Sequence, residues 1–211
     1  MFNILFLLIV LLAGASVYQF FRGRKKNLLL LELASRSLEK HLKPRDKNYL
    51  VIGVYIGFKG FYKIFYKSLE RMEATVLLLP RQSLIYYPIS KLTSRFDRIF
   101  LVFWYNKEIV NEAHLIRKGY YRLGLKKTIK GIEEMIVKQI TLAGKQYYLV
   151  YKQRDYAEKI LDFAKRLHKP DIINHIAIVP QNNTLYMAVK YDPITLDDLL
   201  NKAYEFAKTL A

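Results

Sequence analysis

The sequence predicts an α+β protein: an N-terminal transmembrane helix, then a β-rich, mostly antiparallel body with two amphipathic helices in its C-terminal third. Three patterns predict this fold class. Residues 2–21 carry no charge, residues 48–152 contain short segments rich in β-branched and aromatic residues, and residues 153–211 contain two apolar stripes with helical spacing. The chain has 211 residues, 52% of them hydrophobic, and no cysteine, which excludes thiol catalysis, disulfides and cysteine-ligated metals.

The first element is the apolar run FNILFLLIVLLAGASVYQFF. A helix of this length rises about 30 Å, which matches the hydrocarbon core of a bilayer. Four basic residues follow at once and form the membrane flank: Arg22, Arg24, Lys25 and Lys26. The positive-inside rule then predicts a single-pass cell-membrane protein with its N-terminus outside and its C-terminal body in the cytoplasm. A cleaved signal peptide is the alternative, although no basic segment precedes the apolar run.

Residues 27–47 are expected to form a juxtamembrane helix and a linker. The apolar stripe of residues 27–42 indicates a helix that either continues the anchor as a stalk or packs on the body. Lys43-Pro44 ends this helix, because the residue before a proline avoids the helical conformation. The predicted organisation is therefore an anchor with its basic flank at 1–26, a helix and linker at 27–47, and an α+β body at 48–211, β-rich to residue 152.

Seven segments of the body are expected to be strands: NYLVIGVYIGF, MEATVLLL, SLIYYPI, RIFLVFWY, AHLIRKGYYRL, MIVKQITL and QYYLVYK. The stretch GFKGFYKIFYK at 57–67 fits a helix by its aromatic spacing, whereas its two glycines and its poor helix formers favour a strand. As a strand, it places an uncharged face against the core. Its other face, with Phe61, Lys63, Phe65 and Lys67, would then lie at an edge of a basic sheet.

The C-terminal third changes in character. Asp155 with Glu158 resembles a capping box that opens a helix at 156–168, and Thr195 with Asp198 resembles a second one that opens the final helix. The two apolar segments between these helices flank Gln181-Asn182-Asn183 and predict a hairpin.

Positive charge is concentrated in the first part of the chain. Residues 22–130 hold 24 Lys and Arg against 8 Asp and Glu, whereas residues 131–211 hold 11 against 10. This asymmetry predicts, besides the bilayer itself, an anionic partner, and the tether favours anionic lipid headgroups. A protein partner, a nucleic acid and a solvated face without a partner remain alternatives. The candidate surface consists of Lys59, Phe61, Lys63, Phe65 and Lys67.

The sequence contains no phosphate-binding loop, dinucleotide fingerprint or nucleophile elbow, and its four histidines lack metal-ligand spacing. We therefore expect no catalytic residue, metal or cofactor. The expected function is a membrane-anchored cytoplasmic binding or scaffolding module with a basic surface. One alternative is a membrane-tethered hydrolase that uses the carboxylates of Asp192, Asp197 and Glu133. A further alternative is a membrane-tethered nucleic-acid-binding protein.

Overall fold

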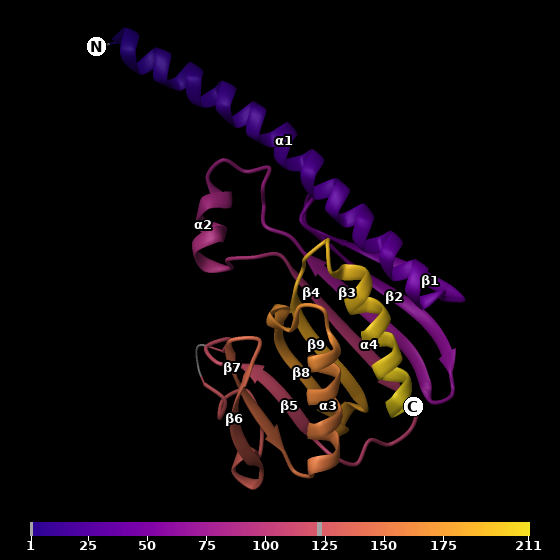
Figure 1. Cartoon of the computed structure of the whole chain (residues 1–211). Helices are drawn as coiled ribbons and strands as arrows, with labels where there is room; N and C mark the ends of the chain where they lie inside the picture. The colour runs from indigo at the N-terminus through magenta and orange to yellow at the C-terminus, as the bar shows by residue number, and fades with distance from the viewer. Residues whose placement is uncertain (1, 122–123) are drawn as a thin grey trace.

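The computed structural model describes residues 2–121 and 124–211 and has the predicted α+β architecture (Figure 1). Nine strands of the described part form one sheet in the order β1-β2-β3-β4-β9-β8-β5-β7-β6, and every pairing is antiparallel. The strands are β1 (Asp46–Ile52), β2 (Gly57–Tyr66), β3 (Leu69–Leu77), β4 (Arg98–Tyr105), β5 (Ala113–Arg117), β6 (Ile136–Leu142), β7 (Lys145–Tyr151), β8 (Ile173–Val179) and β9 (Thr184–Lys190). The helices are α1 (Phe2–Leu42), α2 (Tyr86–Thr93), α3 (Arg154–Arg166) and α4 (Leu196–Leu210), with short 3₁₀ turns at Ile132–Glu134, Pro170–Ile172 and Pro180–Asn182.

Helix α1 joins the apolar run and the predicted juxtamembrane helix without a break. Its first half is long and apolar enough to cross a membrane, and residues 3–18 are all exposed. Its second half lies against α4 and β2 and buries Ala34, Leu38 and Leu42 in the main core. The helix therefore both continues the apolar run and packs on the body.

Strand β1 returns along α1, so the sheet lies beside the helix axis (Figure 1). The β1–β2 turn reaches back to the level of Phe20 and Arg24, whose side chains lie against Tyr55. The strand β2 then runs the other way for about 30 Å, at about 3.3 Å per residue. We call the end of the sheet at the β1–β2 turn the near end and the end at the β2–β3 turn, Lys67-Ser68, the far end.

Residues 57–66 are a strand, as the glycines and the side-chain chemistry predicted. Phe58, Tyr62 and Ile64 are buried, and Phe61 and Phe65 are exposed on the opposite face. Two details of the prediction were wrong. The segment NYLVIGVYIGF is not one strand, because Gly53 and Tyr55 adopt left-handed backbone conformations that turn the chain between β1 and β2. The edge of the sheet is therefore β1, and β2 lies inside it.

The predicted strand SLIYYPI was also wrong, because this segment forms a connection and the start of α2. Pro88 is the third residue of that helix. The first four N–H groups of a helix have no partner within it, so proline is tolerated there, whereas inside a sheet it removes a ladder hydrogen bond.

The two C-terminal helices and the β8–β9 hairpin are as predicted, and β6 and β7 form a further hairpin. The two predicted capping boxes do not form, because neither α3 nor α4 has a side-chain cap hydrogen bond. Glu158 instead pairs with Arg154, and Asp198 accepts a hydrogen bond from the backbone N–H of His168. Helices α3 and α4 contact each other through Phe163 and Phe206, whose rings stack with centroids 4.9 Å apart.

The two faces of the sheet differ. Helices α1, α3 and α4 lie on one face and enclose the main core (Figure 1). On the other face, residues from the 118–135 segment pack over β5 and β7 in a smaller cluster with Ile116 and Val150. The remainder of that face, from β1 to β4 and β9, carries mostly exposed or half-buried side chains, and we call it the open face.

The second half of α1 should contribute to folding as a core helix. Leu38→Ala removes a fully buried side chain and should lower the free energy of unfolding by about 2–5 kcal/mol. Leu33→Ala is the matched control, because Leu33 is 41% exposed on the same helix, and it should change stability by less than ~0.5 kcal/mol. Thermal unfolding of the full chain in detergent, followed by circular dichroism, measures both. Equal effects of the two changes would show that this half is a solvated stalk.

Candidate functional site: the open face of the sheet

The open face presents side chains that point away from the helices on five neighbouring strands. Directly paired residues of antiparallel strands share a face, so the register fixes which side chains meet there. From β1 to β9 they include Asn48, Leu50, Lys59, Phe61, Lys63, Arg71, Glu73, Thr75, Phe100, Val102, Trp104 and Tyr186. Aromatic rings and cations therefore alternate across a surface that no described helix covers.

Lysine and phenylalanine residues of β2 form one part of this face, where the alternation of the strand places them. The Nζ of Lys59 lies 4.8 Å from the centroid of the Phe61 ring and 2.8 Å from Oε2 of Glu73. The Nζ of Lys63 lies 3.2 Å from Oδ2 of Asp46. Both lysines are thus already paired with a carboxylate, although Lys63 and Asp46 are well exposed.

The remaining members of the predicted surface lie at the far end of β2. Phe65 is 64% exposed, and the guanidinium of Arg45 lies 5.0 Å from its ring centroid. Lys67 has a left-handed backbone conformation in the β2–β3 turn and lies over the ring of Tyr66. The structure therefore brings Lys59, Phe61 and Lys63 together on the open face and extends the set toward the far end.

Sequence reasoning missed the part of the face that β4 and β9 contribute. The guanidinium of Arg71 stacks on Trp104 at 4.5 Å from the ring centroid, and Phe100 stacks on Tyr186 with centroids 6.4 Å apart. In RIFLVFWY the two-residue alternation of a strand places Phe100 and Trp104 on one face with Arg98, but every residue after the arginine is apolar, so the sequence does not show which face is buried. Tyr186 reaches the face because β9 pairs with β4 across about 80 residues of chain, and no sequence pattern reports that pairing.

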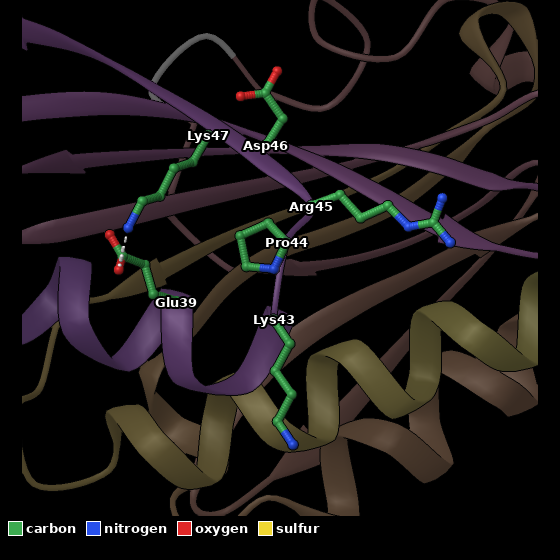
Figure 2. Close-up of a pocket in the computed structure, with 6 residues that line it drawn as sticks. All are labelled: Glu39, Lys43, Pro44, Arg45, Asp46 and Lys47. Carbon is green, nitrogen blue, oxygen red and sulfur yellow. Dashed lines mark ion pairs between the residues drawn. The ribbon is translucent and has the colours of Figure 1, made fainter.

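A shallow pocket of about 380 Å³ lies at the far end, where α1 ends and β1 begins. Its lining residues are Glu39, Lys43, Pro44, Arg45, Asp46 and Lys47. Figure 2 shows that Lys47 reaches across to Glu39, at 2.5 Å, while Lys43, Arg45 and Asp46 point in different directions. The pocket therefore gathers no convergent set of groups for a substrate.

The three carboxylates of the hydrolase alternative are not brought together. Asp197 lies in the first turn of α4 and accepts hydrogen bonds from Lys40 and Ser37, which lower the pKa of its carboxyl to about 2. Asp192 pairs with Lys169 at 3.0 Å. Glu133 is exposed in the Ile132–Glu134 turn, on the opposite side of the sheet from α4. Among the described residues, no group of three His, Asp or Glu side chains has the arrangement of a metal site.

A buried polar chain lies beside the open face, and no sequence pattern indicated it. His114 of β5 and His175 of β8 are joined by their Nδ1 and Nε2 atoms at 3.2 Å. His114 Nε2 lies 2.9 Å from Oε1 of Glu112, and Tyr121 Oη lies 2.8 Å from Nδ1 of His175. Gln181 closes the chain by donating to Glu112.

One arrangement of protons satisfies every member of this chain. Tyr121 donates to His175, His175 to His114, and His114 to Glu112, with both imidazoles neutral. Burial raises the pKa of Glu112, but the hydrogen bonds from His114 and Gln181 outweigh burial and lower it overall. These five side chains include no serine, threonine or cysteine that a histidine could activate, so we assign them to the packing of β5 against β8.

No family model matches the chain, and no curated protein matches it in sequence. The open face is therefore interpreted from its geometry. Its stacked rings can bind planar or apolar groups, and its cations can attract negative charge.

The buried polar chain predicts a stability that falls in acid. Burial, with a smaller effect of His114, holds the pKa of His175 well below its ordinary value of 6.5. The unfolded chain therefore binds more protons than the folded chain below pH 6.5, so stability is fully present above that pH and decreases as the pH falls. The slope should approach ~1.4 kcal/mol per pH unit for this one group.

Urea unfolding of the full chain in detergent between pH 7.5 and 5 measures this effect. His175→Gln removes the titrating group and keeps an amide that can donate to His114, so it should flatten the slope. The same change at the exposed His168 is the matched control. An unchanged slope in His175→Gln would contradict the assignment.

Proposed function

We propose that this chain is a single-pass membrane-anchored binding or scaffolding module whose body stands in the cytoplasm and whose open face binds a protein partner. The observation that carries the proposal is the pair of cation–aromatic contacts, Lys59 with Phe61 and Arg71 with Trp104, on the uncovered side of the sheet. Exposed aromatic and arginine side chains are enriched at protein interfaces.

The charges of the open face favour a protein over a nucleic acid. Lys59 and Lys63 are each paired with a carboxylate, and Glu73 lies between Lys59 and Arg71. A phosphate backbone gains affinity mainly when free cations displace its counterions. A face of mixed sign with exposed rings is better suited to a protein surface that carries both acidic and apolar side chains.

The distance of Phe65 and Lys67 from the near end of the sheet argues against anionic lipid as their partner. Phe65 and Lys67 lie about 30 Å from the near end of the sheet, well beyond the ~8 Å screening length of physiological salt. Headgroup binding at these residues would need the body to bend toward the bilayer, which the continuous α1 opposes. The prediction of headgroup contact at Arg22, Arg24, Lys25 and Lys26 is compatible with this geometry and stays a prediction.

No observation favours the hydrolase alternative, since Asp192 and Asp197 are each held by a different basic partner. The membrane anchor is supported by the length and apolar character of the first half of α1 and by its exposure. The cytoplasmic orientation is supported by the four basic residues that follow the apolar run.

The partner is tested by photocrosslinking in the cells that produce the protein. Benzoylphenylalanine at Phe61 or Phe65 replaces an exposed ring with a larger ring and should form a discrete protein adduct. Val110, 74% exposed in the β4–β5 connection, is the control position and should form none. Arg71→Glu should reduce the adduct at Phe61 roughly tenfold, because it places a like charge against an acidic partner. The same change at the exposed Lys145 should leave it unchanged.

The chemistry of the adduct distinguishes a protein partner from nucleic acid and lipid. An adduct at Phe61 that nuclease removes would favour nucleic acid, and an adduct with lipid alone would favour headgroups. Equal yields at Phe61 and Val110 would contradict the open face as a binding surface.

Topology is tested with a single cysteine, because the natural chain has none. Lys145→Cys lies at the exposed start of β7, next to the β6–β7 turn, and should react with a membrane-impermeant maleimide only after the cells are permeabilised. Mass spectrometry of the membrane-extracted chain should find the apolar run, residues 2–21, still attached to the body. Labelling of intact cells would reverse the orientation, and a shortened chain would show signal-peptide cleavage.

A further inference from the structure

The near end of the sheet is fastened to α1 where the apolar run ends. The side chain of Gln19 donates to the carbonyl of Arg81 at 2.6 Å. Gly23 lies so close to the same carbonyl that a Cβ there would be 2.1 Å from its oxygen. The residues after β3 are therefore level with the last turn of the apolar run and the first turn of the basic flank.

The β1–β2 turn is held at the same level. Asn27, fully buried, donates from Nδ2 to the carbonyls of Tyr55 and Leu79 at 2.8 and 2.9 Å. The side chain of Gln82 donates to the carbonyl of Val54 at 2.9 Å and so ties the two connections together. Both connections thus project from the body at the height where α1 would leave the bilayer.

The side chains that project there are apolar and exposed. Helix α2 buries none of its residues. Leu92 is 80% exposed, Ile85 69% and Tyr86 67%, and Ile89 lies one turn before Leu92 on the same helix. Val51 and Val54, beside and within the β1–β2 turn, are exposed as well. Single exposed apolar residues are ordinary, but a helix without one buried residue gains little stabilising contact from the body.

We propose that α2 and the β1–β2 turn form an interfacial docking surface that inserts into the same bilayer leaflet from which α1 emerges. This inference rests on the proposed membrane anchor. The occupant is lipid because the two connections are fixed at the level of the end of the apolar run, where a bilayer around α1 would surround them. Figure 1 shows α2 displaced from the sheet, at the end of the body from which the first half of α1 extends.

The surrounding chemistry is that of a membrane interface. An interfacial helix typically buries an apolar face about 5–10 Å deep while basic residues remain at the headgroups. Lys91 on α2 and Arg95 just after it are exposed, as are Lys25 and Lys26 on α1. Tyr86 adds an amphipathic ring of the kind that is enriched at the headgroup level.

The docking surface is tested with single-cysteine variants of the full chain reconstituted into phosphatidylcholine–phosphatidylglycerol vesicles. Ile89→Cys, Leu92→Cys and Val54→Cys carry an environment-sensitive fluorophore, and lipids with a nitroxide near the headgroup or deep in the tails act as quenchers. We expect blue-shifted emission at all three positions and roughly twofold or stronger quenching by the shallow nitroxide than by the deep one. Glu70→Cys, exposed on β3 near the far end, is the matched control and should be quenched by neither.

A fifth label, in the apolar run, tests the membrane anchor separately from the docking surface that rests on it. Ile9→Cys lies in the middle of the apolar run and should be quenched best by the deep nitroxide. If Ile9→Cys is quenched in this way while Ile89→Cys, Leu92→Cys and Val54→Cys behave like Glu70→Cys, the anchor stands and the docking surface is overturned. If Ile9→Cys itself escapes quenching, the membrane anchor fails. Ile89→Glu should weaken the shallow quenching at Leu92→Cys, because a carboxylate on the same helix disfavours insertion, whereas the quenching at Val54→Cys should remain, because α1 holds the β1–β2 turn at its level.

Discussion

The arrangement of the molecule depends on the contacts that Asn27 and Arg81 make where α1 meets the near end of the sheet. Asn27 is fully buried and binds two backbone carbonyls, and its Oδ1 accepts a hydrogen bond from Arg81 at 3.1 Å. Arg81 also forms a two-pronged ion pair with Asp97, at 2.9 and 2.6 Å. A buried network of this kind is costly when one member is lost, because the remaining groups stay desolvated without partners. It therefore holds the helix and both connections in one arrangement.

This junction has consequences for the whole body because α1 is a single helix from Phe2 to Leu42. The same helix carries the exposed apolar run at one end and forms part of the core at the other, so it fixes the orientation of that run relative to the sheet. Near the far end, Asp197 of α4 binds Ser37 and Lys40, so α1 is fastened to the body at both ends of its packed half. The sheet then stands along the helix axis, with α3, α4 and the packed half of α1 on one face and the aromatic and basic side chains on the other.

Sequence patterns could predict the elements whose neighbours are close in the chain. The apolar run, the C-terminal helices and the two faces of β2 follow from spacing alone, since each element shows its own periodicity. The turn between β1 and β2 could not be found in this way, because Tyr55 is a strand-forming residue that adopts a left-handed conformation where Asn27 and α1 hold it. Helix α2 was missed because its isoleucine and tyrosines favour strands, while no described strand is adjacent to pair with it. The candidate site likewise has a part that the sequence could predict and a part that it could not. Lys59, Phe61 and Lys63 alternate within one strand, so their common face follows from spacing. Tyr186 and the His114–His175 pair depend on strands that pair across long stretches of chain.

The folded chain has two basic surfaces of different chemistry, which composition alone could not distinguish. Composition predicted one anionic partner for all of residues 22–130. In the folded chain the basic residues of this region lie on two different parts of the surface. Those of α1 and α2 at the near end remain exposed beside apolar side chains, whereas Lys59 and Lys63 of the open face are each paired with a carboxylate, of Glu73 and Asp46. Free cations next to exposed apolar groups suit a lipid interface, and paired cations next to stacked rings suit a protein surface. The two parts of the basic region are therefore best understood as two surfaces, one at the near end and one on the open face of the sheet, held in fixed relation by α1.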